Sequence, residues 1–121
     1  MKYDDSNIFA KILRVEIPCK KIYEDEFGLS FYDINPQNKV HALVIPKGKY
    51  TDLDDFSSKA SSEEMVGLLK GINTVAKKLG ISSDTGKGYR ALANISEDGG
   101  QEVPHLHFHL FGGEKIGKMV Q

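Results

Sequence analysis

The stretch His105-Leu106-His107-Phe108-His109-Leu110-Phe111 holds three of the four histidines in the 121-residue chain. Successive side chains of an extended strand point to opposite faces, so the three histidines would share one face and their apolar neighbours the other. Three imidazoles that charged near their ordinary pKa of about 6.5 would repel one another. Such a cluster is typical of a site that binds an anion, a metal or a transferring group. We therefore predict a last strand from about Val103 to Phe111 with a histidine cluster on one face.

Two chemistries fit this histidine face. In the first, a neutral imidazole nitrogen attacks phosphorus, and neighbouring histidines set its tautomer and bind the phosphoryl oxygens. In the second, a His-x-His pair of the run and His41 hold a zinc ion, which keeps one position open for water. The zinc alternative is weaker, because no obvious carboxylate lies within or next to the run to act as a base or to orient the ligands.

The segment before the histidine run offers further donors to an anion. Gly99-Gly100-Gln101 lies directly before the run, where unhindered backbone N–H groups could face a phosphate. Gly-Gly in a connecting loop is also most often simply a turn. Asn94 lies on the preceding predicted strand, Tyr89 to about Ser96, and its side-chain amide either donates to the ligand or makes a hydrogen bond at the strand end.

The first half of the chain predicts one short helix and three strands. Asn7 can cap a helix that continues to about Arg14. Short β-prone runs separated by turn residues then predict hairpin-connected antiparallel strands. These runs are Lys20 to Tyr23, Phe27 to Ile34 and Lys39 to Ile45.

A long helix separates these strands from the last two. Ser61-x-x-Glu64 has the form of a capping box, and apolar residues at helical spacing follow it as far as Leu79. Gly80 suits the C-terminal cap. Because strands cluster before and after this helix, the chain is predicted to have an α+β fold with an antiparallel sheet.

Composition excludes several classes of protein. Hydrophobic residues make up 40% of the chain and charged residues 27%, which disfavours disorder, a membrane span and an export signal. Sixteen basic and seventeen acidic residues give a net charge of -1, so binding to nucleic acid or to a membrane surface is not expected. The single cysteine, Cys19, cannot form an intrachain disulfide. We expect a soluble, cytoplasmic protein.

Together these motifs resemble the histidine triad family, and within it the nucleotide-binding branch of purine nucleoside phosphoramidases. The resemblance covers nearly the whole chain and is strongest at the histidine run and the glycines before it. Upstream support comes from Ile8-Phe9, Glu16-Ile17-Pro18, Tyr32-Asp33-Ile34 and the segment from His41 to Pro46. The resemblance implies a five-stranded antiparallel sheet with one long and one short helix, continued across a homodimer, and residues 1–121 as a single domain of the family.

The resemblance also implies roles for matching positions. His107 resembles the nucleophile, His105 and His41 the hydrogen-bonded partners that set its protonation, and His109 a phosphate ligand. Asp33 matches the acceptor for the ribose hydroxyls. The remaining matches are Asn94, Gly100 and Gln101 for the phosphate, and Ile8, Phe9, Ile12, Phe31, Tyr32 and Ile34 for the base pocket, where a purely core role explains each apolar residue equally well. Glu102 stands where some members carry a serine thought to donate to the leaving amine.

The sequence thus predicts a hydrolase of purine nucleoside phosphoramidates or aminoacyl-adenylates that needs no metal or cofactor. A covalent nucleotidyl group on His107 would be its intermediate, and purine nucleoside monophosphates and their conjugates its ligands. Three alternatives stay open: a dinucleoside polyphosphate hydrolase of the same family, a nucleotide-binding or scaffold protein with vestigial turnover, and a zinc-dependent hydrolase.

Overall fold

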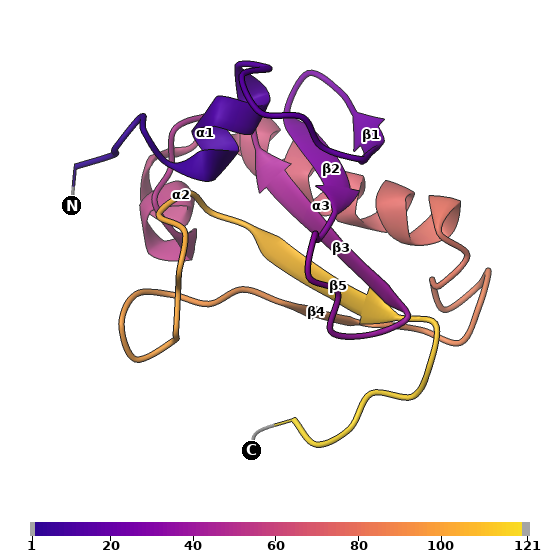
Figure 1. The fold of residues 1–121 in the computed structure, drawn as a ribbon. Helices are drawn as coiled ribbons and strands as arrows, with labels where there is room; N and C mark the ends of the chain where they lie inside the picture. Colours follow the sequence, from indigo (N-terminus) through magenta and orange to yellow (C-terminus); the bar gives the residue numbers. More distant parts are fainter. Residues whose placement is uncertain (1, 120–121) are drawn as a thin grey trace.

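Five antiparallel strands form the sheet at the centre of the molecule (Figure 1). The computed structural model describes residues 2–119. The strands lie side by side in the order β1-β2-β3-β5-β4. Their bounds are Lys21–Glu24 for β1, Gly28–Tyr32 for β2, Val40–Pro46 for β3, Arg90–Leu92 for β4 and Phe108–Gly112 for β5. The predicted antiparallel α+β fold is confirmed.

Three helices pack around this sheet. They are α1 at Ile8–Leu13, α2 at Leu53–Lys59 and α3 at Ser62–Lys78. The long helix α3 covers one face of the sheet, and α1 lies on the other side, toward one end of the strands (Figure 1). Within residues 2–119, none of the helices has the length and apolar character that crossing a bilayer requires.

The central strand β3 separates two apolar clusters because its side chains alternate between the faces. Ala42 and Val44 pack in the cluster under α3, whereas Leu43 and Ile45 pack in the cluster under α1. His41 has the parity of Leu43 and Ile45, so its ring lies on the α1 side of the sheet. This alternation places the imidazole of His41 among apolar side chains on the face opposite α3.

Caps at the helix ends agree with the sequence analysis. The Oδ1 of Asn7 accepts the Ala10 backbone N–H at 2.9 Å and begins α1. The capping box at Ser61 and Glu64 is present, and Gly80 follows α3 with a φ of +70°, a conformation that glycine adopts without strain.

The helix α2 was not predicted. Its cap is Asp52, whose carboxylate accepts the Asp55 backbone N–H at 2.8 Å. Seven residues with few apolar side chains give a weak periodic pattern, yet Leu53 and the buried Phe56 fix the helix against the α3 cluster. An acidic first turn and Lys59 in the last turn were the available signals.

The last strand is shorter than predicted, and this corrects the expected extended run of three histidines. Only His109 lies in β5, whereas His105 and His107 precede it. The backbone turns at Pro104, where the His105 N–H donates to the Val103 carbonyl at 2.9 Å, and the Leu106 N–H donates to the Tyr50 carbonyl at 2.9 Å. The strand predicted from Tyr89 to about Ser96 is also shorter in the structure, where β4 spans Arg90–Leu92.

Replacing Ser61 with alanine tests the α3 cap. The Ser61 Oγ accepts the Glu64 N–H at 3.1 Å, and the Glu64 carboxylate accepts the Ser61 N–H at 3.0 Å. We expect Ser61→Ala to lower the free energy of unfolding by about 1 kcal/mol in urea titrations. Ser62→Ala, at the exposed next position, is the matched control and should change it by less than about 0.5 kcal/mol. Equal effects of the two substitutions would contradict the capping role.

Candidate active site

The ring of His107 is oriented by a backbone carbonyl. Its Nδ1 lies 2.8 Å from the carbonyl oxygen of His105. A carbonyl only accepts, so Nδ1 carries the proton. Burial lowers the pKa of His107 below its ordinary value, which keeps the ring neutral at pH 7. The other nitrogen, Nε2, therefore holds a free lone pair.

The ring of His105 is fully buried and has partners on both nitrogens. Its Nε2 lies 2.9 Å from the carbonyl oxygen of Pro46 on β3. Burial lowers the pKa of His105 to about 4, so the neutral ring donates from Nε2 and accepts at Nδ1. The hydroxyl of Tyr3 contacts that Nδ1 at 2.5 Å. No motif or periodicity links residue 3 to residue 105, so Tyr3 could not be predicted from the sequence.

His41, His109 and Asp33 form a second group of contacts. The Gln37 backbone N–H donates to His41 Nδ1 at 3.1 Å, so the proton of neutral His41 sits on Nε2. That Nε2 lies 2.9 Å from His109 Nδ1 and 3.4 Å from Asp33 Oδ2. Burial and the neighbouring His107 and His41 lower the pKa of His109 to about 4. Neutral His109 thus accepts at Nδ1 and carries its proton on Nε2.

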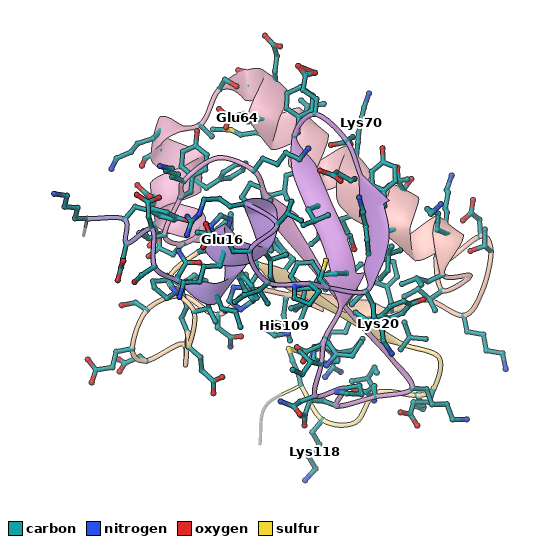
Figure 2. The ribbon with its side chains drawn as sticks, turned by 45° about the horizontal axis from the view of Figure 1, so that its top comes forward. Glu16, Lys20, Glu64, Lys70, His109 and Lys118 are labelled. Carbon is teal, nitrogen blue, oxygen red and sulfur yellow. The ribbon has the colours of Figure 1, made fainter. Side chains whose placement is uncertain are left out.

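Aromatic rings pack this cluster together on the α1 side of the sheet. Phe9 of α1 meets His107 edge to face at a centroid distance of 4.9 Å, and His107 lies 5.0 Å from His109. Phe111 stacks on His109 at 5.6 Å and lies 4.3 Å from His41. In Figure 2, His109 lies away from α3, on which Glu64 and Lys70 are labelled. The structure therefore brings the four predicted histidines together, although His105 and His107 precede β5.

The contacts of the ring nitrogens argue against the zinc alternative. Asp33, His41 and His109 offer ligand atoms within 4.8 Å of one another. A metal on His41 Nε2 would require the ring proton on Nδ1, where it would face the N–H of Gln37. Both nitrogens of His105 are also engaged, so a His105-x-His107 pair does not present two free ligands.

The residues expected to form a base pocket divide into two groups. Three are buried in the apolar cluster beside the histidine rings: Phe9, Ile12 and Phe31. The other three are exposed to 44%, 44% and 85%: Ile8, Tyr32 and Ile34. Only the second group offers free apolar surface, and its role in base binding stays a prediction.

The loop before the histidines uses its donors internally. The N–H groups of Gly100 and Gln101 donate to the carbonyls of Glu97 and Ser96 at 3.0 Å each. The Gln101 amide donates to the Thr51 and Val103 carbonyls at 2.6 and 2.9 Å, and the Asn94 amide donates to the Gly99 carbonyl at 2.7 Å. In this conformation Asn94, Gly100 and Gln101 hold the loop, and their contact with a phosphate stays a prediction.

Glu102 is exposed next to the cluster. Its negative charge acts on His107, where it opposes the lowering of the imidazole pKa by burial. Asp33 acts in the same direction, and its Oδ1 also accepts the Asn35 backbone N–H at 2.8 Å. Two carboxylates therefore act on the charge of His107, and one of them, Asp33, also contacts His41.

Comparison with known proteins agrees with the geometry. The family model of the HIT domain matches residues 14–116. A 13.2 kDa HIT-like protein of Azospirillum brasilense is 52% identical over 118 residues, which cover 98% of this chain and 94% of that protein. The purine nucleoside phosphoramidase of Escherichia coli K12 is 38% identical over 117 residues, which cover 96% and 94% of the two chains.

Solved structures give the same result for the fold. The structure of a HIT family hydrolase from Clostridium thermocellum superposes with a TM-score of 0.86 at 36% identity, and the match covers 98% of this chain and 99% of that one. The chain belongs to the histidine triad (HIT) family, as its motifs predicted.

The buried neutral histidines predict a loss of stability on mild acidification. The pKa of His105 is about 4 in the folded protein and about 6.5 when unfolded, so the unfolded chain binds more protons between these values. We expect the free energy of unfolding to fall by about 2 kcal/mol between pH 7 and pH 5 from His105 alone. Urea titrations at one protein concentration measure this difference. Equal stability at the two pH values would contradict the burial of neutral imidazoles.

Proposed function

We propose that this protein is a hydrolase of purine nucleoside phosphoramidates or aminoacyl-adenylates that acts through a nucleotidyl-histidine on His107. The observation that carries the proposal is the free lone pair on Nε2 of a neutral, buried and oriented imidazole. The similarity to the Escherichia coli phosphoramidase supports the substrate class.

In the first step, Nε2 of His107 attacks phosphorus, and the bond between phosphorus and the leaving nitrogen breaks. The leaving amine takes a proton from a water molecule, which leaves a hydroxide ion. The ring then carries a positive charge, and its Nδ1–H keeps donating to the His105 carbonyl, which stabilises that charge. His109 presents its Nε2–H as a donor to a phosphoryl oxygen.

In the second step, water attacks phosphorus and the bond to Nε2 breaks. The water releases one proton, which balances the proton taken by the amine, and His107 returns to its neutral form. Asp33 binds the ribose hydroxyls, because a carboxylate accepts two hydrogen bonds from a diol. Tyr32 and Ile34, exposed after β2, provide an apolar surface for the base.

The direct test is hydrolysis of a fluorogenic adenosine phosphoramidate by wild-type protein and His107→Asn. Asparagine can still donate to the His105 carbonyl but has no nucleophilic ring nitrogen. We expect kcat/KM to fall at least about 10³-fold, which corresponds to about 4 kcal/mol of barrier. Lys70→Ala, on the opposite face of the sheet, is the control and should keep wild-type turnover.

The same assay separates the alternatives. Chelator-sensitive turnover would point to a zinc hydrolase. Faster cleavage of a dinucleoside polyphosphate than of the phosphoramidate would assign the other hydrolase activity. Nucleotide binding without turnover by the wild-type protein would contradict the proposed hydrolysis and favour a binding or scaffold role.

A further inference from the structure

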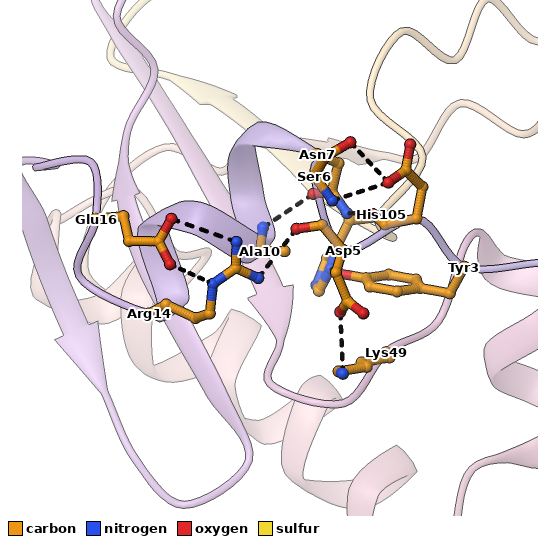
Figure 3. Close-up of polar contacts among 10 residues, drawn as sticks. Tyr3, Asp5, Ser6, Asn7, Ala10, Arg14, Glu16, Lys49 and His105 are labelled. Atoms are coloured by element: carbon orange, nitrogen blue, oxygen red, sulfur yellow. Dashed lines mark hydrogen bonds and ion pairs between the residues drawn. The ribbon is translucent and has the colours of Figure 1, made fainter.

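The N-terminal segment lies against His105, the most buried ring of the histidine cluster (Figure 3). Tyr3, in the segment before α1, is half-buried, and its hydroxyl contacts Nδ1 of His105. The two rings also meet edge to face at a centroid distance of 5.6 Å. Because the sequence separation is 102 residues, only the folded chain brings the phenol to this imidazole.

The direction of the hydrogen bond follows from the other contacts of His105. Its Nε2 faces the carbonyl of Pro46 and must hold the single proton of the neutral ring. Nδ1 can then only accept, so the Tyr3 hydroxyl donates. Burial raises the pKa of Tyr3, which keeps the hydroxyl protonated at neutral pH.

Several contacts hold the segment in place. Lys49 pairs with the Asp5 carboxylate at 2.9 Å, and Arg14 donates to the Asp5 carbonyl at 3.0 Å. Asn7 donates to the Asp4 carbonyl at 2.8 Å from its amide. These contacts, drawn in part in Figure 3, join residues 4 and 5 to α1 and to the segment after β3.

Tyr3 and the proposed nucleophile are connected through one residue, His105, whose ring binds Tyr3 and whose backbone carbonyl accepts from His107. Tyr3 donates to the His105 ring, the His105 ring donates to Pro46 on β3, and the His107 ring donates to the His105 carbonyl. Without the phenol, the fully buried acceptor nitrogen of His105 would lose its partner, and the Pro46 carbonyl alone would hold the ring. The ring and the carbonyl that accepts from His107 belong to the same residue, so a displacement of the ring is expected to displace that carbonyl as well.

We propose that Tyr3 is a positioning residue of the active site, which holds the His105 ring and through it the orientation of His107. The role rests on the proposed function, in which His107 is the nucleophile. Tyr3 itself touches no reacting atom. The N-terminal segment is therefore part of the catalytic machinery, although it lies outside the motifs that identify the family.

Tyr3→Phe is the test, because it removes the hydroxyl and keeps the ring. We expect kcat for the adenosine phosphoramidate to fall about 10-fold with KM changed less than about twofold, since orientation of the nucleophile matters in the transition state. The imidazole ¹⁵N spectrum should show His105 Nδ1 moving downfield, toward the position of a free acceptor nitrogen. The His107 Nδ1–H should exchange faster with solvent.

Tyr23→Phe is the matched control. Tyr23 lies on β1, away from the histidines, and its hydroxyl donates to Asp25 in the following turn at 3.0 Å. We therefore expect kcat and the histidine spectrum to stay as in the wild type. An unchanged kcat in Tyr3→Phe, or a His105 resonance identical to that of the wild type, would overturn the proposal. The ¹⁵N comparison tests the Tyr3 contact independently of turnover. Failure of the wild-type protein to hydrolyse the phosphoramidate would contradict the proposed function separately.

Discussion

The hydrogen bond from His107 Nδ1 to the carbonyl of His105 is the interaction on which the chemistry of the site depends. It leaves the lone pair of that ring on Nε2, and in the proposed mechanism it gives the positive charge of the nucleotidyl-imidazolium a fixed acceptor. The turn at Pro104 makes this bond possible, since an extended strand would direct the carbonyl of residue 105 into the sheet ladder. The short β5 is therefore part of how the site is built.

The fold and the histidine cluster could largely be predicted from the sequence, because both rest on local patterns. The caps at Asn7 and Ser61 and the strand predicted from Lys39 to Ile45 agree with the structure. The histidines were expected on one extended strand, whereas only His109 lies in β5. The helix α2 was not predicted, because its apolar pattern is short. The predicted homodimer and single domain stay predictions, as do the roles of the individual site residues.

The tautomers of the histidines could not be predicted, because their partners are backbone groups and a hydroxyl that no motif links to the rings. Pro46, Gln37 and Tyr3 supply backbone or hydroxyl groups that only the folded chain brings to the rings. No residue type or spacing identifies a carbonyl as the acceptor for one ring nitrogen. Similarly, the family resemblance implies a phosphate contact for Gln101, whereas its side-chain amide donates to the Thr51 and Val103 carbonyls in the structure.

A covalent bond between His107 Nε2 and phosphorus is the step that distinguishes the proposed mechanism from its alternatives. Rapid quenching of the wild-type reaction into alkaline denaturant preserves the acid-labile bond between phosphorus and nitrogen, and peptide mapping by mass spectrometry then locates it. We expect one nucleotidyl group per chain on the His107 peptide, formed and lost within a turnover. A group on His105 or His109, or turnover without any adduct, would contradict it.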